Sequence, residues 1–437
     1  MFINKKVAFY TLGCKLNFSE SSTIGRQLTN IGFLKTDFTN KADLYVINTC
    51  SVTENANKEC KRIIRKAKKY SPGAFVVVTG CFAQLKPKEI SSIEGVDMVL
   101  GANDKFNLPE LLTNLDINKN TQVHGCEINN LNYFSSYSLN DRTRSFLKIQ
   151  DGCDYPCTYC TIPLARGKSR CDRIENIIKN AKEIARKGIQ EIVITGVNIG
   201  DFKDKDTQQD FAALIKELDC IEGIKRYRIS SIEPNLITNE IIKIVKNSKK
   251  FMPHFHIPMQ SGSDLILGKM KRRYQTKLYR NKINAIVKEI KDVCIGADVI
   301  VGFPGETQEE FNKTLSFIKD LPLSYLHVFT YSERENTPAI LMDGMVNKKE
   351  RANRSKQLRI LSNKLQRLFY EKYINTEQTA LFEQENKNNY LFGFTNNYIK
   401  IKIPFNAKYC KTQQKVKLLD IDQNGVMKAK LLNNKTT

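Results

Sequence analysis

The sequence lacks tryptophan and contains only four histidines. It has no apolar run of the ~18–20 residues that a helix needs to cross a bilayer. Its first ten residues read as a charged strand without the apolar stretch of a secretory signal. These absences predict a cytoplasmic protein without a membrane partner. In that compartment the 12 cysteines are not expected to form disulfides, which leaves metal ligation or burial as their roles.

Acidic residues are too few to balance the basic ones. The chain has 46 Asp and Glu against 69 Lys and Arg, a formal net charge of +23. Such a charge favours a polyanionic partner, above all nucleic acid. Part of the basicity can also come from a composition rich in Lys, Asn and Ile. The length of 437 residues is sufficient for two or three domains.

Residues 153–160 carry three cysteines at a three-then-two spacing, Cys153, Cys157 and Cys160, with Tyr159 before the last. A fully ligated 4Fe–4S cluster uses four thiolates. Three leave one iron open, and an open position is typical of a catalytic metal site. A zinc knuckle or a structural cluster is the alternative, but zinc needs a fourth Cys or His nearby and the flanks contain no histidine. The segment resembles the signature of the radical S-adenosylmethionine (SAM) superfamily, which implies that SAM binds the open iron.

Three further cysteines follow three predicted strands within residues 1–135. The strands cover 7–12, 44–48 and 75–78 and run into Cys14, Cys50 and Cys81. Helices are predicted over 19–29, with Ser19 as the N-cap, and over 54–70. This alternation indicates a doubly wound parallel sheet, whose strand carboxyl ends form the ligand crevice. We therefore expect the three thiols to converge, although scattered cysteines are often only small core residues.

The segments around these cysteines, residues 11–17, 48–52 and 79–81, resemble the N-terminal domain of the methylthiotransferases. This branch of the radical SAM enzymes carries an auxiliary 4Fe–4S cluster, which the resemblance assigns to Cys14, Cys50 and Cys81. Lys15-Leu16-Asn17 is similar to the branch that acts on threonylcarbamoyladenosine in tRNA. The isopentenyladenosine branch usually shows Gln-Met-Asn there, and the ribosomal-protein branch Pro-Lys-Asn. Those two substrates, and a non-catalytic iron–sulfur module that binds RNA, are the alternatives.

Residues 140–347 contain six strand-then-helix units, which predict an open (β/α)6 barrel with its functional groups beyond the strand carboxyl ends. Gly196 follows the second strand, and Ser231 and Glu233 follow the third. By resemblance, these three residues and Tyr159 contact SAM. His254 and His256 in the fourth strand are predicted to lie on different faces, which argues against a two-histidine metal site.

Basic and aromatic residues between the fourth and fifth strands predict an RNA contact, with a solvated helix face as the alternative: Lys271, Arg272, Arg273 and Tyr274.

The pattern of residues 348–373 predicts a basic helical linker. Residues 374–437 contain five short alternating segments that fit a small β-barrel. They resemble the TRAM domain of RNA-modifying enzymes, and a purely stabilising β-domain is the alternative.

The resemblance covers nearly the whole chain. It implies a tRNA methylthiotransferase that holds two 4Fe–4S clusters and uses SAM both as radical source and as methyl donor. The implied reaction places a methylthio group at C2 of threonylcarbamoyladenosine beside the anticodon. The implied partners are tRNA and an electron donor such as flavodoxin or ferredoxin, while the sulfur donor is not indicated.

Overall fold

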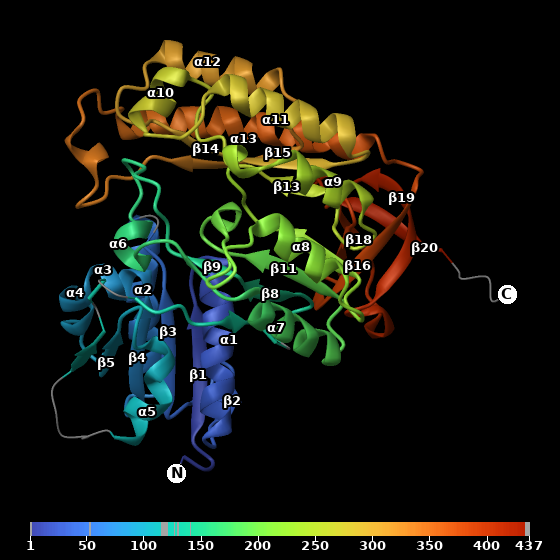
Figure 1. The fold of residues 1–437 in the computed structure, drawn as a ribbon. Coiled ribbons are helices and arrows are strands. Elements are labelled where there is room, and N and C mark those ends of the chain that lie inside the picture. The colour runs from blue at the N-terminus through green and yellow to red at the C-terminus, as the bar shows by residue number, and fades with distance from the viewer. Residues whose placement is uncertain are drawn as a thin grey trace.

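The computed structural model describes residues 2–51, 54–114, 121–125, 127–128, 131–139 and 141–432. Figure 1 shows an N-terminal sheet domain, a central barrel and a C-terminal β-barrel. This arrangement confirms the predicted α/β fold class. The predicted limits 1–135, 140–347, 348–373 and 374–437 stay predictions. Val52, residue 140 and residues 433–437 lie outside the described part.

The N-terminal domain is a parallel sheet in the order β2-β1-β3-β4-β5-β6. Its strands are β1 (Lys6–Thr11), β2 (Leu34–Thr36), β3 (Leu44–Thr49), β4 (Phe75–Gly80), β5 (Met98–Leu100) and β6 (Gln122–His124). Its helices are α1 (Lys15–Asn30), α2 (Glu54–Tyr70), α3 (Cys81–Leu85), α4 (Pro87–Ser91), η1 (Lys105–Asn107) and α5 (Leu108–Thr113). The whole of β3 is buried because hydrophobic clusters cover both faces of the sheet. The sheet order brings the carboxyl ends of β1, β3 and β4 side by side.

The helix predicted over 19–29 begins four residues earlier than expected. α1 starts at Lys15, and its N-cap is Cys14. The predicted N-cap Ser19 is wrong, because Ser19 lies inside the helix and donates to the carbonyl of Leu16 at 2.8 Å. The first turns of α1 carry buried polar residues that contact the central barrel. In the sequence these polar residues resemble a solvated loop, which hid the true start.

The central domain is an open barrel of six parallel strands. They are β8 (Ser145–Lys148), β11 (Glu191–Thr195), β12 (Arg226–Ile229), β13 (His254–His256), β14 (Cys294–Val301) and β15 (Tyr325–Thr330). Isolated parallel bridges such as Ser231↔His256 join β12 to β13. Within the described residues β15 pairs only with β14, and β7 (Ser136–Tyr137) pairs antiparallel with β8. The barrel is therefore open between β7 and β15, as predicted.

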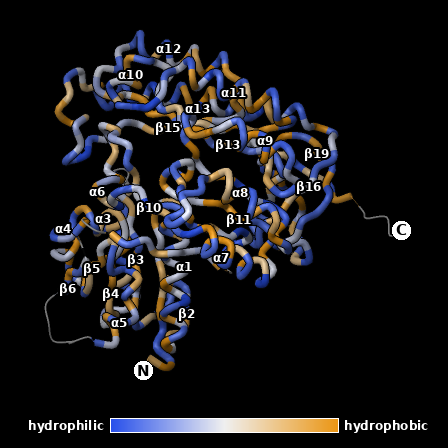
Figure 2. The backbone as a smooth tube through the Cα atoms, viewed as in Figure 1, coloured by the Kyte–Doolittle hydropathy of each residue, from blue (hydrophilic) through white to orange (hydrophobic). Residues whose placement is uncertain are grey.

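Helices cover the outside of this barrel, and hydrophilic residues predominate along α11 and α12 (Figure 2). The remaining elements of the domain are β9 (Gln150–Asp151), α6 (Ile162–Arg166), β10 (Arg170–Cys171), α7 (Ile174–Arg186), η2 (Ile199–Asp201), α8 (Phe211–Asp219), η3 (Pro234–Leu236), α9 (Asn239–Asn247), α10 (Asp264–Lys269), α11 (Thr276–Glu289), α12 (Gln308–Lys319) and η4 (Pro338–Leu341). Among the described residues, no helix combines the length and the hydrophobicity that crossing a bilayer requires.

The long helix α13 (Lys348–Glu371) packs on β14 and β15 and leads into a closed barrel in the order β16-β17-β18-β20-β19. Its elements are β16 (Glu377–Lys387), β17 (Tyr390–Thr395), β18 (Lys400–Pro404), η5 (Ala407–Tyr409), β19 (Gln413–Ile421) and β20 (Met427–Leu431). This barrel docks on the amino-terminal end of the central barrel. Arg226 and Arg228 of β12 both donate to the backbone carbonyl of Thr395, at 2.9 and 2.7 Å, and Glu191 lies between the two guanidinium groups.

Candidate functional site

The first group of thiols meets at the carboxyl edge of the N-terminal sheet. Thr49 of β3 pairs with Gly80 of β4, so Cys50 and Cys81, one residue further on, are neighbours. Gly13 has φ +98°, and a Cβ added to it would lie 2.9 Å from the sulfur of Cys50. The residue before Cys14 therefore touches Cys50. Cys14, Cys50 and Cys81 therefore follow neighbouring strands at one edge of the sheet, with Cys14 and Cys81 each at the start of a helix, and a shared cluster on them stays a prediction.

The second group of thiols lies in the loop after β9, beyond the carboxyl end of β8. Every sulfur receives a hydrogen-bond donor: the amide of Tyr155 on Cys153 at 3.4 Å, the amide of Ile162 on Cys160 at 3.4 Å, and the Arg272 guanidinium on Cys157 at 3.1 Å. Donors to sulfur stabilise thiolate ligands and tune iron–sulfur centres.

The thiols are not activated as free nucleophiles. Burial raises the pKa of Cys153 to about 11 and that of Cys160 to about 12. Without a metal these groups stay protonated at neutral pH, whereas a coordinated metal deprotonates a thiol. Among the described residues, neither trio of thiols gathers within 4.8 Å, as the ligands of one zinc ion would. These observations argue against a catalytic cysteine and against a zinc ion held by all three thiols.

A buried ion network joins the two groups of thiols. Arg166 ends α6, which follows Cys160, and α6 packs against α3, which begins at Cys81. The guanidinium of Arg166 donates to Glu20 at 3.0 Å, to Asp151 at 2.9 Å and to Asn17 at 2.6 Å. Lys105 lies 2.7 Å from Glu20. Burial alone would raise the pKa of Glu20, but Arg166, Lys105 and Lys148 lower it to about 2.

The residues expected to contact SAM lie around the Cys153 loop. Tyr159 packs edge-on against Phe303, and Glu233 forms an ion pair with Arg272. Ser231 hydrogen-bonds the Nδ1 of His256 at 2.8 Å. At Gly196 an added Cβ would meet Ile199 at 2.8 Å and Gln150 at 3.0 Å. Gly196 is therefore needed for packing of its loop against these side chains.

Two polar atoms that the sequence did not single out also lie at this end of the barrel. The Oδ1 of Asn198, after β11, and the Oγ of Ser230, after β12, are buried and have no hydrogen-bond partner among the described residues. A buried polar atom without a partner is costly. The carboxyl end of the barrel therefore fits a polar ligand such as SAM. Asn198 stands two residues after Gly196, so this motif was the available signal.

The predicted separation of His254 and His256 is wrong. Residues two apart in a strand share a face, and both rings stack on Tyr325 of β15. His256 and His327 lie 3.1 Å apart, and Asp298 of β14 contacts them at 3.2 and 3.3 Å. The ligand atoms of these three residues lie within 4.8 Å of one another. They form a polar layer inside the barrel that sequence spacing did not reveal.

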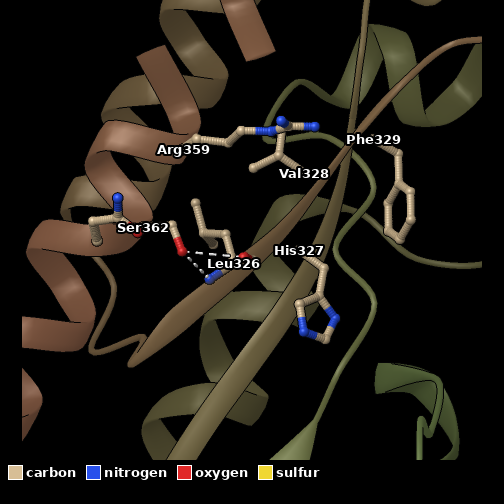
Figure 3. A pocket seen from close by; sticks show the side chains of 7 residues that line it. Leu326, His327, Val328, Phe329, Arg359 and Ser362 are labelled. Carbon is tan, nitrogen blue, oxygen red and sulfur yellow. Dashed lines mark hydrogen bonds between the residues drawn. The ribbon is translucent and has the colours of Figure 1, made fainter. Parts of the chain in front are cut away.

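Figure 3 shows how β15 contributes to this layer. Leu326 and Val328 point toward Ser362 and Arg359 of α13, while His327 and Phe329 project from the opposite side of the strand. The side chain of His327 is 55% exposed and Phe329 is 43% exposed. Because these residues face inward yet remain accessible, the interior of the barrel is reachable by solvent at the β15 edge.

The stretch predicted to contact RNA divides into two kinds of residue. Arg272, with 4% of its side chain exposed, and Tyr274, 5% exposed, are buried. Their assignment to an RNA-contacting surface is wrong, because Arg272 reaches Cys157 and Glu233 while Tyr274 donates to the carbonyl of Pro258. Lys271 and Arg273 are exposed, and an RNA contact by them stays a prediction.

Two protein-family models match the chain. The model described as "Uncharacterized protein family UPF0004" matches residues 6–101, and the model described as "Radical SAM superfamily" matches residues 147–318. The first covers the sheet that gathers Cys14, Cys50 and Cys81. The second covers the barrel with Cys153, Cys157 and Cys160.

Curated relatives match over most of their length. Threonylcarbamoyladenosine tRNA methylthiotransferase MtaB of Bacillus subtilis is 39% identical, over 90% of this chain and 89% of the relative. The protein of the same name from Aquifex aeolicus is 37% identical, over 91% and 96%. A tRNA-2-methylthio-N(6)-dimethylallyladenosine synthase of Clostridium tetani is 33% identical, over 88% and 87%.

Solved structures with the same fold include the radical S-adenosylmethionine methyltransferase TsrM from Kitasatospora setae. It superimposes with a TM-score of 0.57 at 13% identity, over 78% of this chain and 77% of that one. At this identity the likeness shows the fold alone.

The network around Arg166 yields a stability prediction. Glu20→Gln keeps the shape of the side chain but leaves three buried cations facing Asp151 alone. We expect the free energy of unfolding, measured by urea denaturation, to fall by about 3–5 kcal/mol, because an uncompensated buried charge is costly. Glu240→Gln, which breaks the exposed ion pair with Lys216, serves as the control and should change the stability very little. Equal losses in the two variants would contradict the assignment.

The same network predicts a pH dependence. The folded pKa of Glu20, about 2, lies below its ordinary value of 4.5. Its stabilising contribution is therefore complete above about pH 4.5 and is lost as the pH falls toward 2. The difference in unfolding free energy between wild type and Glu20→Gln should shrink over that window.

Proposed function

Because this chain belongs to the tRNA methylthiotransferase family, we propose that it places a methylthio group at C2 of threonylcarbamoyladenosine beside the anticodon of tRNA. The observation that carries the proposal is the pair of three-thiol groups joined through Arg166. The relatives of highest identity named above carry the threonylcarbamoyladenosine name. A cytoplasmic location belongs to the same proposal.

Each group of thiols would hold one 4Fe–4S cluster, the first on Cys153, Cys157 and Cys160 and the auxiliary one on Cys14, Cys50 and Cys81. When bound, the clusters and SAM supply the radical chemistry that breaks an unactivated aromatic C–H bond, the methyl group, and the sulfur that is transferred. Acid–base side chains at neutral pH cannot break such a bond. The reaction would also need an electron donor, such as flavodoxin or ferredoxin, and a sulfur donor that is not identified.

The protein's own residues would position the reactants and limit water. Arg272 fixes the loop of Cys157 by donating to its sulfur while it pairs with Glu233. Tyr159, Gly196, Ser231 and Glu233 surround the space for SAM, with Asn198 and Ser230 offering free polar atoms. Arg166 holds the auxiliary thiols against this end of the barrel, so an adenine entering between them would meet both sites.

Because one of the relatives is a dimethylallyladenosine synthase, isopentenyladenosine in tRNA is the alternative substrate. Mass spectrometry of tRNA nucleosides from cells with and without the gene separates the two. Loss of the methylthio form of threonylcarbamoyladenosine supports the proposal, and loss of the isopentenyl form overturns it.

Removing single thiols separates the two sites. We expect Cys157→Ala to abolish formation of 5′-deoxyadenosine from SAM under anaerobic reducing conditions, because its cluster loses one of three protein ligands. Cys50→Ala should keep part of that cleavage but make no methylthio product. Liquid chromatography of 5′-deoxyadenosine and mass spectrometry of the RNA give the two readouts. Methylthiolated RNA from Cys50→Ala would contradict the auxiliary role, and a wild type that never cleaves SAM would favour a non-catalytic module.

Gly13 offers a subtler test of the auxiliary site. In Gly13→Ala the new Cβ would lie 2.8 Å from the Cβ of Cys50, at a backbone φ of +98°. We expect about half of the bound iron to be lost, because one of two clusters no longer assembles. Gly188→Ala is the matched control, since Gly188 has φ +75° but nothing within 4 Å of an added Cβ. Iron analysis should find full occupancy in that control, and full occupancy in Gly13→Ala would count against the site.

A further inference from the structure

Lys15 begins α1 immediately after Cys14. On a helix, residues at positions 15, 19, 22 and 26 lie along one stripe. The later members of this stripe contact the edge of the central barrel at β7. Ser19 hydrogen-bonds Ser136 at 2.9 Å, Ser22 accepts from the amide of Leu139 at 3.1 Å, and Arg26 lies over the ring of Tyr137. The stripe therefore follows the open edge of the barrel and ends at Lys15.

The packing of α1 turns the face that carries Lys15 toward the interior of the barrel. Phe18, one turn after Lys15, packs on Phe146 of β8 with ring centroids 6.3 Å apart. Leu147, the next residue of β8, lies in the core beneath the outer helices, so Phe146 and the α1 face that packs on it point inward. Lys15 itself is exposed to solvent, so a ligand can reach it.

The charged residues inside the barrel have partners, whereas Lys15 has none among the described residues. Glu191 contacts Arg144 at 3.3 Å and Arg228 at 3.1 Å. Asp298 is shared by His256 and His327. Lys15 makes no hydrogen bond or ion pair with any residue that the structure describes. Lys15 is thus a cation without a contacting partner in the described part of the chain, which an anionic ligand would match.

We propose that Lys15 is a specificity-determining residue that binds the carboxylate of the threonylcarbamoyl group. This rests on the proposed function and goes beyond it by naming the group that reads the substrate. A threonylcarbamoyl substituent carries a carboxylate, whereas a dimethylallyl substituent is a hydrocarbon that would leave the ammonium desolvated and unpaired. A site built to pair with a polar group rejects an analogue that lacks it.

A second unpaired cation, Arg334, is the main rival for the carboxylate. Its Nε and one terminal nitrogen are buried without a partner in the described part of the chain. Burial lowers the pKa of Arg334, while the nearby Cys50 and Glu54 of the N-terminal domain raise it. Arg334 thus lies beside the auxiliary thiols, and Lys15 lies in the barrel interior.

The test compares RNA affinities of the holoenzyme. Anticodon stem-loops carry threonylcarbamoyladenosine, its carboxamide, or unmodified adenosine, and dissociation constants are measured anaerobically by fluorescence anisotropy. Wild type should bind the carboxylate form more tightly than the carboxamide. In Lys15→Met this preference should fall roughly tenfold to a hundredfold, with affinity for the carboxamide nearly unchanged. Lys15→Arg should restore part of the preference.

Lys41→Met is the matched control. Lys41 is exposed and precedes β3, so it lies at the amino-terminal ends of the strands, away from the carboxyl ends where Cys14 lies. This variant removes one positive charge without touching the barrel. It should keep the wild-type preference. A Lys15→Met enzyme that keeps the preference, one that weakens all three RNAs equally, or an Arg334→Met enzyme that alone loses the preference would overturn the inference. Each of those outcomes leaves the proposed function intact if wild type still methylthiolates the threonylcarbamoyl RNA, and failure of that reaction in wild type would instead overturn the proposed function.

Discussion

The buried guanidinium of Arg166 is the interaction on which the arrangement of the site depends. It contacts Asn17 and Glu20 from the N-terminal domain and Asp151 from the barrel, with 4% of its side chain exposed. Taking a charge out of water costs several kcal/mol unless good partners replace the water. A planar guanidinium with five donors can serve several acceptors at once, which a lysine ammonium cannot do in the same geometry. The two groups of thiols are therefore held in a fixed position relative to each other.

A second buried ion network closes the other end of the barrel. Glu191 contacts Arg144, Arg226 and Arg228, and although burial would raise its pKa, these cations lower it to about 2. The two β12 arginines then use their remaining donors on carbonyls of the C-terminal barrel. Tyr398 of that barrel packs on His254 with ring centroids 4.2 Å apart. The C-terminal barrel thus forms the floor beneath the polar layer, while the carboxyl end keeps its unpartnered polar atoms.

The sequence predicted the features that depend on local pattern. Cysteine spacing pointed to the Cys153 group, the placement of cysteines after strands pointed to the Cys14 group, and apolar segments located the six strands of the barrel. The features that depend on tertiary contacts were less predictable. Arg272 looked like a surface residue because its neighbours are basic, but it is folded inward by Cys157 and Glu233. Arg166 gave no signal either, because its partners are far away in the chain: Glu20 is 146 residues distant. Strand periodicity places His254 and His256 on one face, and the prediction that they lie on different faces was wrong.

The first and last residues of the tripeptide after Cys14 have different surroundings at the start of α1. Asn17 is fixed by its surroundings, since it accepts from Arg166 at 2.6 Å and donates to the carbonyls of Leu12 and Thr49 at 2.8 and 3.0 Å. It holds the loops of Cys14 and Cys50 together whatever the substrate is. Lys15 stands two residues earlier, about 200° around the helix, and faces the barrel interior. A replacement at residue 15 therefore leaves the contacts of Asn17 with Arg166 and with the Cys14 and Cys50 loops in place.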